Sequence, residues 1–127
     1  MGRLTTHILD TMSGKPAAGV TIELFCMDGA SASDSDSDGA GRDLLAKAIT
    51  NADGRCEKPL LEGDVFRVGV YELVFHVGDY FAKAGVAVSE PPFLDAVPVR
   101  FSIADADSHY HVPLLVSPYG YSTYRGS

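Results

Sequence analysis

The chain has 127 residues, of which 46% are hydrophobic and 21% charged, a size and composition typical of one globular domain. Ten basic and seventeen acidic residues give a net charge of −7, which argues against nucleic acid as a partner. No apolar run is long enough to span a membrane and the N-terminal residues lack a signal-peptide pattern, so we expect a cytoplasmic protein without membrane contact.

Alternation of apolar and polar residues predicts half-buried strands, which in chain order include residues 20–24, 66–77 and 99–103. Within the second of these, the alternation slips between Gly69 and Glu72, which predicts a β-bulge.

Turns rich in glycine and proline separate these strands at residues 13–19, 51–55 and 89–92. One short helix is expected at residues 79–85, where Gly85 is suited to cap its C-terminal end. Together these elements predict an all-β fold, a two-sheet β-sandwich with one short helix, in a single domain that spans residues 1–127.

Residues 31–41, SASDSDSDGAG, are expected to form a flexible acidic loop because they offer no large apolar side chain to a core. The run Asp34–Gly39 matches the first half of an EF-hand calcium loop. Leu45, however, occupies the final position of that loop, where a bidentate glutamate is required, so we expect no calcium site. Cys26 and Cys56 form no CxxC pair, so neither a zinc site nor a disulfide framework is expected.

Two of the four histidines, His7 and His111, lie inside predicted strands. One face of the strand that holds His111 is expected to be core, with the side chains of Tyr110, Val112, Leu114 and Val116. His111 shares the other face with Pro113, whose missing N–H suits an edge strand or a bulge, so this strand is expected to have an exposed or interfacial side. Arg55 follows a turn. These residue types could form a histidine and arginine site, but each histidine could equally be a partly buried side chain with a structural partner.

Three segments resemble the transthyretin-related 5-hydroxyisourate hydrolases: LTTHILDTMSGKPAAGV (4–20), TNADGRC (50–56) and YHVPLLVSPYGYSTYRGS (110–127). The segment PPFLDAVPVRF (91–101) is also similar to that family. The C-terminal tetrapeptide YRGS, Tyr124 to Ser127, is the signature that separates these hydrolases from the transthyretins, which carry hormones on the same scaffold.

This resemblance implies a transthyretin-like β-sandwich that assembles as a homotetramer, a dimer of dimers with active sites between the dimers. It implies hydrolysis of 5-hydroxyisourate to 2-oxo-4-hydroxy-4-carboxy-5-ureidoimidazoline in urate degradation, with no metal and no other cofactor. Carried over residue by residue, the catalytic set is His7, Arg55, His111 and Ser127, and the substrate-binding set is His7, Arg55 and Tyr124.

The chemistry of these residues suits the reaction. A histidine with a pKa near neutrality can deprotonate water, and a guanidinium offers a planar set of donors to a urate-like edge. One of His7 and His111 is expected to activate water while the other holds or relays a proton, and the sequence does not distinguish them. Ser127 could act through its hydroxyl or through its terminal carboxylate.

Two other functions stay open at this point. A noncatalytic carrier would bind a small aromatic ligand in the same cleft, and a structural adhesion module would not need the C-terminal tetrapeptide. A carrier has no use for two histidines and an arginine around its channel, which favours the hydrolase. The final residues RGS do not form a peroxisomal signal.

Overall fold

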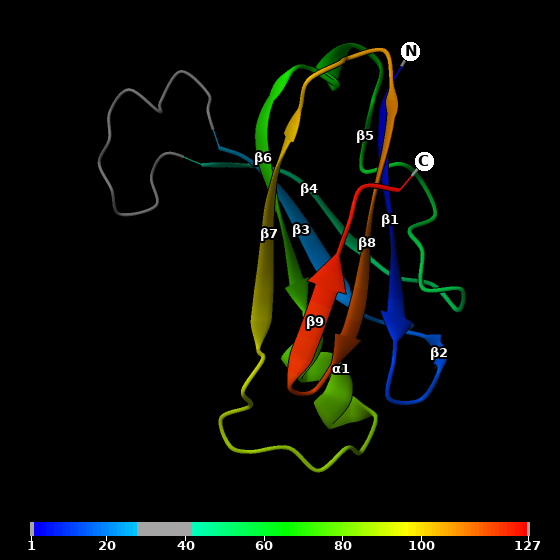
Figure 1. Ribbon diagram of the computed structural model, residues 1–127, viewed down its shortest axis with the longest axis vertical. Coiled ribbons are helices and arrows are strands. Elements are labelled where there is room, and N and C mark those ends of the chain that lie inside the picture. The colour runs from blue at the N-terminus through cyan, green and yellow to red at the C-terminus, as the bar shows by residue number, and fades with distance from the viewer. Residues whose placement is uncertain (1, 28–41, 127) are drawn as a thin grey trace.

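The computed structural model describes residues 2–27 and 42–126, so the acidic segment 31–41 and Ser127 lie outside the described residues. The chain forms two stacked β-sheets and one short α-helix (Figure 1). One sheet has the order β2 (Lys15–Pro16), β1 (Arg3–Asp10), β8 (His109–Ser117) and β9 (Gly120–Thr123), with β5 (Leu61–Glu62) also pairing with β1. The other has the order β4 (Asp43–Ile49), β3 (Thr21–Cys26), β6 (Gly69–His76) and β7 (Ala96–Ile103). This confirms the predicted two-sheet sandwich with one helix.

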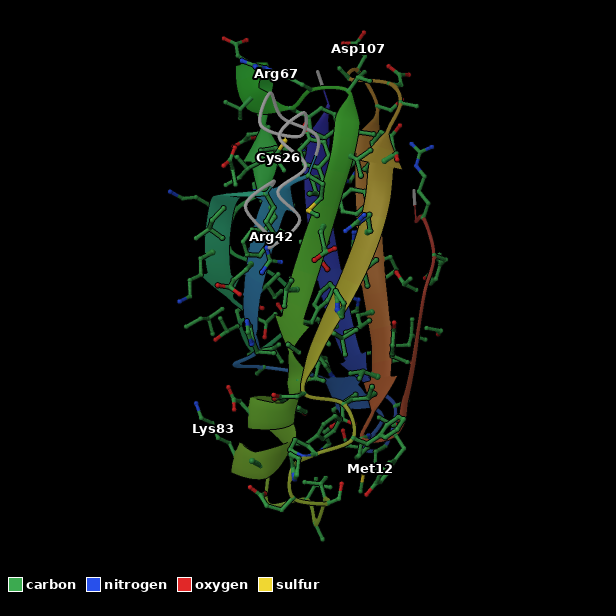
Figure 2. All side chains as sticks on the ribbon, turned by 90° about the vertical axis from the view of Figure 1, so that its left-hand side faces the viewer. Met12, Cys26, Arg42, Arg67, Lys83 and Asp107 are labelled. Atoms are coloured by element: carbon green, nitrogen blue, oxygen red, sulfur yellow. The ribbon has the colours of Figure 1, made fainter. Side chains whose placement is uncertain are left out.

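The hydrophobic core lies between the two sheets, and both contribute alternate residues of their strands. Figure 2 views the fold from the side of the β4–β3–β6–β7 sheet, where Cys26 and Arg42 lie. The side chains of Leu4, Ile8, Ile22, Leu24, Leu73, Phe75 and Leu114 have no exposed surface. Because neighbouring residues of a strand point to opposite faces, burial of Leu4 and Ile8 turns the odd-numbered residues of β1 away from the core.

Strands β1 and β8 are parallel neighbours, and their register determines which outward-facing side chains meet. Arg3 pairs with His109, Thr5 with His111, and His7 with Pro113. On β8 the alternate residues Tyr110, Val112, Leu114 and Val116 are buried, as the sequence predicted for that face. The histidines of β8 therefore lie on the outer face of the sheet, beside the outward residues of β1.

The predicted bulge in the segment 66–77 is wrong. Strand β6 pairs with β7 without a break from Gly69 to His76, and the irregularity in this sheet lies instead between Leu24 and Phe25, where β3 meets β4. The alternation is lost because β6 is an inner strand that is covered on both faces.

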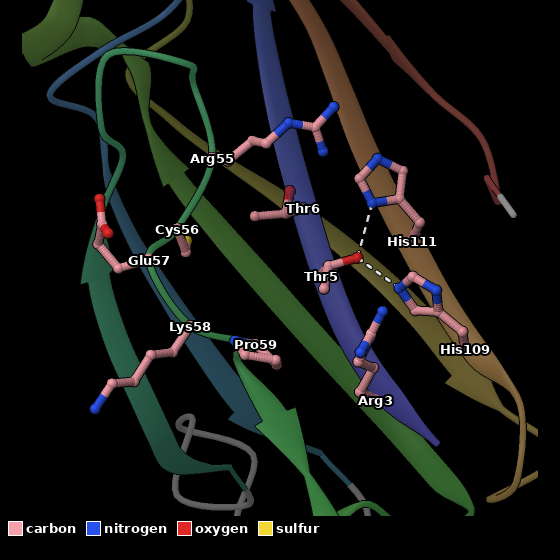
Figure 3. Close-up of a pocket in the computed structure, with 10 residues that line it drawn as sticks. All are labelled: Arg3, Thr5, Thr6, Arg55, Cys56, Glu57, Lys58, Pro59, His109 and His111. Atoms are coloured by element: carbon pink, nitrogen blue, oxygen red, sulfur yellow. Dashed lines mark hydrogen bonds between the residues drawn. The ribbon is translucent and has the colours of Figure 1, made fainter. Parts of the chain in front are cut away.

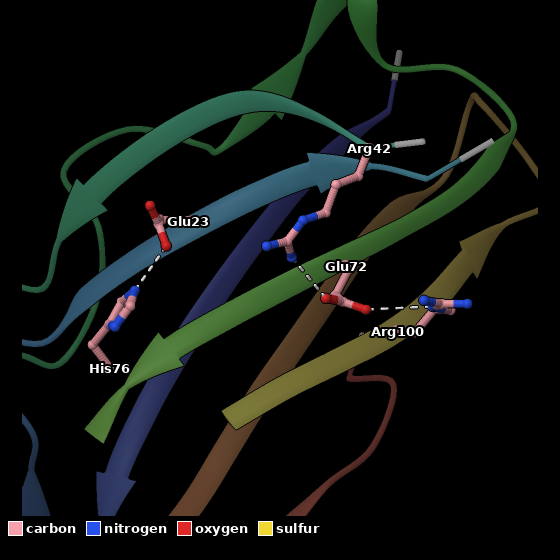
Figure 4. Close-up of polar contacts among 5 residues, drawn as sticks. All are labelled: Glu23, Arg42, Glu72, His76 and Arg100. Carbon is pink, nitrogen blue, oxygen red and sulfur yellow. Dashed lines mark hydrogen bonds and ion pairs between the residues drawn. The ribbon is translucent and has the colours of Figure 1, made fainter. Parts of the chain in front are cut away.

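The outer face of β6 is covered by an ion-paired cluster (Figure 4). Glu72 is only 9% exposed, and its carboxylate oxygens lie 3.3 Å from Arg42 Nη1 and 3.3 Å from Arg100 Nε. On the same face, His76 Nε2 lies 2.7 Å from Glu23 Oε1. On the outer face of β6, a buried glutamate and a half-buried histidine thus take the place of the exposed polar residues that a half-buried strand would show.

The position of Pro113 also differs from expectation, because β8 is an inner strand between β1 and β9. Pairing with β9 begins only at Leu114, so Pro113 lies just beyond the part of β8 that β9 covers. The hydroxyl of Thr123 donates a 2.7 Å hydrogen bond to the Pro113 carbonyl there. The proline is tolerated by the limited length of β9 rather than by a free edge.

Helix α1 (Val77–Lys83) begins two residues before the predicted start and follows β6 directly. Gly85 has a φ of +79° just after its end, as expected for a glycine that terminates a helix. The Tyr80 hydroxyl donates a 2.8 Å hydrogen bond to Asp10, and this bond ties the helix to the end of β1. A short 3-10 helix at Gly63–Val65 completes the described elements.

The turn at residues 51–55 carries Arg55 to the outer face of β1. The Asn51 side-chain oxygen accepts hydrogen bonds from the backbone N–H groups of Asp53 (2.9 Å) and Arg55 (3.2 Å). Gly54 has a φ of +73°, and its carbonyl accepts a 2.9 Å hydrogen bond from the Ile8 N–H. The turn is thereby attached to β1, and Arg55 forms a bridge with His7.

Gly54→Ala is expected to destabilise the protein more than Gly14→Ala. Both glycines have a positive φ, +73° and +76°, so both substitutions carry a similar backbone strain of about 1–2 kcal/mol. A Cβ at Gly54 would lie 2.5 Å from the Ile8 carbonyl oxygen, whereas nothing lies within 4 Å of a Cβ at Gly14. Overpacking should add roughly 1–3 kcal/mol at Gly54. Urea denaturation of the two variants measures the difference, and equal losses would contradict the role given to this turn.

Candidate functional site

A cavity of about 470 Å³ opens on the outer face of β1 and β8, where the segment after the 51–55 turn passes over it (Figure 3). Its lining is mostly polar and comes from three separate parts of the chain: Arg3, Thr5, Thr6, Arg55, Cys56, Glu57, Lys58, Pro59, His109 and His111. A second, more open hollow lies beside it and shares His109 and His111. The two histidines of β8 therefore stand between two accessible spaces.

Thr5 links these two histidines. Its Oγ1 lies 2.9 Å from Nδ1 of His111 and 2.8 Å from Nε2 of His109 (Figure 3). The contact follows from the register, because Thr5 pairs with His111 and lies one outward position away from the partner of His109. All three side chains are partly exposed, so they face the cavity while their backbones remain fixed in the sheet.

Arg55 approaches the histidines from the opposite wall. Figure 3 shows its guanidinium reaching across β1 toward His111, on the side of that ring away from Thr5. Burial lowers the pKa of His111, and the positive charge of Arg55 and the nearby His7 and His109 lower it further. The ring is therefore neutral at pH 7, with one nitrogen able to accept a proton.

His7 lies next to this group on β1, two residues beyond Thr5 and therefore on the same face. Its pKa is also lowered, first by burial and then by the charge of Arg55, while a hydrogen bond to the Asp53 backbone and the Asp53 carboxylate act in the opposite direction. Two neutral histidines and one guanidinium thus share the outer face of β1 and β8.

The C-terminal segment lies across β8 and contacts His111 directly. The Gly126 N–H donates a 2.7 Å hydrogen bond to the His111 carbonyl. The guanidinium of Arg125 lies 4.0 Å from the centre of the Tyr110 ring, and its Nη2 donates a 3.3 Å hydrogen bond to the His109 carbonyl. A Cβ on Gly126 would lie 2.8 Å from Cδ2 of His111, so a larger residue here would displace that ring or the C-terminal segment.

The structure brings together three of the residues expected from the sequence, His7, Arg55 and His111. Tyr124 is 60% exposed and lines the second hollow beside His111, so it lies near the site rather than in its first cavity. Ser127 lies outside the described residues, and its role stays a prediction.

Sequence reasoning missed Thr5 and His109. The signal was present, because each lies two residues before an expected site residue, Thr5 before His7 and His109 before His111. In a strand this spacing places both members of a pair on one face. The hydrogen bonds between Thr5 and the histidines span more than a hundred residues of sequence, so no local pattern could reveal them.

Within residues 2–27 and 42–126, no group of three or more histidine, cysteine or acidic side chains could hold a metal ion. Cys26 and Cys56 form no disulfide in this part of the chain. Cys56 lines the cavity, and burial raises the pKa of its thiol, which makes it a poor nucleophile at neutral pH. None of the helices that the structure describes is long and apolar enough to cross a membrane.

A family model described as the HIUase/Transthyretin family matches residues 4–126. The chain belongs to this family. It is 58% identical to 5-hydroxyisourate hydrolase 2 of Rhizobium meliloti, over 99% of this chain and 97% of that protein.

Two solved structures that are similar to this chain differ in function. The structure of Klebsiella pneumoniae 5-hydroxyisourate hydrolase superposes with a TM-score of 0.75 at 35% identity and covers 100% of both chains. Sea bream transthyretin, solved in complex with thyroxine, superposes with a TM-score of 0.78 at 28% identity, over 98% of this chain and 94% of that one. The fold is therefore common to a hydrolase and to a thyroxine-binding protein, and the residues of the site must separate the two functions.

Arg55→Gln is expected to raise the pKa of both His7 and His111, because it removes a positive charge that disfavours their protonation. Burial, the larger cause, remains, so both values should stay below that of an exposed histidine. Titration of the imidazole resonances by NMR measures these shifts. Arg67→Gln, which removes an exposed arginine whose Nε donates to the Asp64 carbonyl, provides the control. Unchanged histidine pKa values in Arg55→Gln would contradict the placement of the guanidinium.

Proposed function

We propose that this chain hydrolyses 5-hydroxyisourate to 2-oxo-4-hydroxy-4-carboxy-5-ureidoimidazoline, a step of urate degradation. The observation that carries the proposal is the position of the Arg55 guanidinium beside the neutral imidazole of His111 in one polar cavity. The high identity to a 5-hydroxyisourate hydrolase over nearly the whole chain supports it.

The reaction needs a base, a water molecule and a group that stabilises negative charge on the attacked carbonyl oxygen. A neutral histidine in the cavity can take the proton from water as the water attacks. Arg55 can donate hydrogen bonds to the oxygen on which charge develops. The arginine thus lowers the barrier for attack, and its charge adds to burial in lowering the pKa of the base.

Tyr124 and Ser127 are proposed to complete the pocket. Tyr124 lines the second hollow with Arg125 and Gly126, so its ring is available to a substrate that lies over His111. Ser127 is included because it follows Gly126 in the sequence, and the Gly126 N–H donates a hydrogen bond to the His111 carbonyl. Either the hydroxyl or the terminal carboxylate of Ser127 could hold water or substrate.

We also propose a homotetramer, a dimer of dimers whose sites lie in the cleft between dimers. The outward side chains of β1 and β8 that form the site are partly exposed in the single chain, and Tyr121 and Tyr124 are 46% and 60% exposed. An opposing copy of this face would exclude water from the cavity and cover these aromatic rings. A cytoplasmic location remains a prediction.

A noncatalytic carrier is the competing function, because sea bream transthyretin holds thyroxine on the same fold. The cavity here is lined by Arg3, Arg55, Lys58 and two histidines. An aromatic hormone would displace water from these charged and polar groups without offering hydrogen bonds of similar strength. The charged lining therefore favours a small polar substrate and supports the hydrolase.

His111→Asn is expected to lower kcat/KM for 5-hydroxyisourate by about a hundredfold to ten-thousandfold, the usual contribution of a general base. The substrate can be generated from urate with urate oxidase, and its ultraviolet decay compared with the spontaneous rate. His76→Asn is the matched control, because His76 lies on the other sheet in a pair with Glu23. A protein that binds the intermediate without accelerating its decay would favour the carrier instead.

The activity is expected to fall as pH decreases, with a midpoint below pH 6.5. The pKa values of His7 and His111 are both lowered from 6.5, so the neutral, catalytically competent forms persist below that pH. As pH falls, the histidines of the unfolded chain bind protons before those of the folded protein do. The free energy of unfolding therefore also decreases once the pH drops below the pKa of these histidines in the unfolded chain. Circular dichroism at each pH separates the two effects. A folded protein whose activity is lost with a midpoint above pH 6.5 would contradict the assignment.

A further inference from the structure

The hydrogen bonds around Thr5 restrict the protonation of both histidines that it contacts. A hydroxyl has one hydrogen to donate, and Thr5 Oγ1 lies within hydrogen-bond distance of Nδ1 of His111 and Nε2 of His109. Both hydrogen bonds form only if the Thr5 hydroxyl donates to one histidine ring and accepts from the other. Two arrangements meet this condition, and they give His111 opposite tautomers.

In the first arrangement, Nδ1–H of His111 donates to Thr5 and the Thr5 hydroxyl donates to Nε2 of His109. Nε2 of His111 then carries a lone pair that faces the cavity. In the second arrangement, Nε2–H of His109 donates to Thr5 and the Thr5 hydroxyl donates to Nδ1 of His111. Neutral His111 then carries its hydrogen on Nε2 and cannot accept a proton there.

The position of Arg55 selects the first arrangement. Its guanidinium lies on the side of the His111 ring away from Thr5, which is the side of Nε2 (Figure 3). A guanidinium carries only donors, so a lone pair on that nitrogen is attracted to it, whereas an N–H would point its positive end at a cation. Arg3 and Lys58 also line the cavity and act in the same sense, and among the lining residues that the structure describes only Glu57 carries the opposite charge.

We propose that Thr5 and His109 are positioning residues that hold His111 in the tautomer whose Nε2 accepts a proton, which makes His111 the base of the site. The inference rests on the proposed hydrolysis for its catalytic meaning, while the tautomer itself can be measured without substrate.

The proton inventory of the reaction is consistent with this arrangement. An O–H bond of water breaks as its oxygen bonds to the carbonyl carbon, and the released proton forms an N–H bond at Nε2 of His111. The resulting imidazolium keeps its Nδ1–H bond to Thr5, and that bond strengthens because the donor is now charged. During the attack the π electron pair of the carbonyl moves to its oxygen. When this pair re-forms the C=O bond, the ring C–N bond breaks, the proton on Nε2 passes to the leaving nitrogen and His111 returns to its starting state.

The local structure suits a positioning role. Thr5 is β-branched, so its χ1 angle has few accessible values, and its backbone is fixed by pairing with β8. His109 is held at its carbonyl by the Arg125 side chain, and His111 by the Gly126 N–H. The backbones of His109 and His111 are therefore held without the Thr5 hydroxyl. The hydroxyl is left to determine which ring nitrogen of His111 carries the hydrogen.

The test compares Thr5→Val, which keeps the shape and removes the hydroxyl, with Thr5→Ser, which keeps the hydroxyl. Thr11→Val is the control, because Thr11 also bonds across to β8, at the Val116 carbonyl (3.2 Å), but at the far end of the strand pair. We expect Thr5→Val to lower kcat by about tenfold to a hundredfold with a smaller change in KM. Thr5→Ser should retain most of the activity, and Thr11→Val nearly all of it.

The second readout is the tautomer of His111, measured from the imidazole nitrogen resonances of ¹⁵N-labelled protein. The wild-type chain should carry hydrogen on Nδ1 of His111, and Thr5→Val should lose this preference. His109→Phe should reduce kcat in the same direction. Combined with Thr5→Val it should cost little more than Thr5→Val alone, because the two act through one network.

Two results would overturn the inference: hydrogen on Nε2 of His111 in the wild-type protein at neutral pH, or an active wild-type enzyme whose kcat is unchanged in Thr5→Val. A wild-type protein that does not accelerate 5-hydroxyisourate decay would refute the proposed function instead. In that case the tautomer measurement still decides whether Thr5 sets the proton on His111.

Discussion

The parallel pairing of β1 with β8 is the constraint on which the site depends. It joins the beginning of the chain to its end and sets Thr5 beside His111. Because side chains alternate along a strand, a slip of one residue would send the histidines of β8 into the core and expose Tyr110 and Val112. The hydrophobic core therefore fixes the register, and the register assembles the site as a consequence of burying the other face.

Electrostatics in the cavity run against the overall charge of the protein. The chain carries a net charge of −7, yet in the described part of the cavity lining one acidic residue, Glu57, stands against Arg3, Arg55 and Lys58. Local charges dominate because those more distant than about 8–10 Å are screened by salt. Burial lowers the pKa of His111 and the charge of Arg55 lowers it further, so the site holds a guanidinium beside a neutral base. A histidine in place of Arg55 would be neutral at the pH where His111 is neutral, so it could not supply the positive charge beside the base.

Local patterns predicted the outward and inward faces of β8, the helix that ends before Gly85 and the turn before Arg55. They failed where tertiary surroundings decide the outcome. Strand β6 lost its alternation because Arg42 and Arg100 cover Glu72, two contacts that no local pattern encodes. The family resemblance pointed to His7, Arg55 and His111 as site residues. It did not reveal the hydrogen bonds of Thr5, because these depend on the pairing of two strands that are far apart in the sequence. His109 could have been predicted, because it lies two residues before His111 and two such residues of a strand share one face.

The order of the C-terminal segment has a physical cause in the same strand. Chain ends usually fray because few contacts hold them. Here Arg125 lies over the ring of Tyr110, a residue only 6% exposed, whose hydroxyl accepts hydrogen bonds from the N–H groups of Ala104 (2.8 Å) and Asp105 (3.1 Å). The segment is thus attached to a rigid part of the sandwich, and Gly126 can pack against His111 because it has no side chain. Arg125 and Gly126 each bond the backbone of a β8 histidine, so these two residues link the end of the described chain to the geometry of the site.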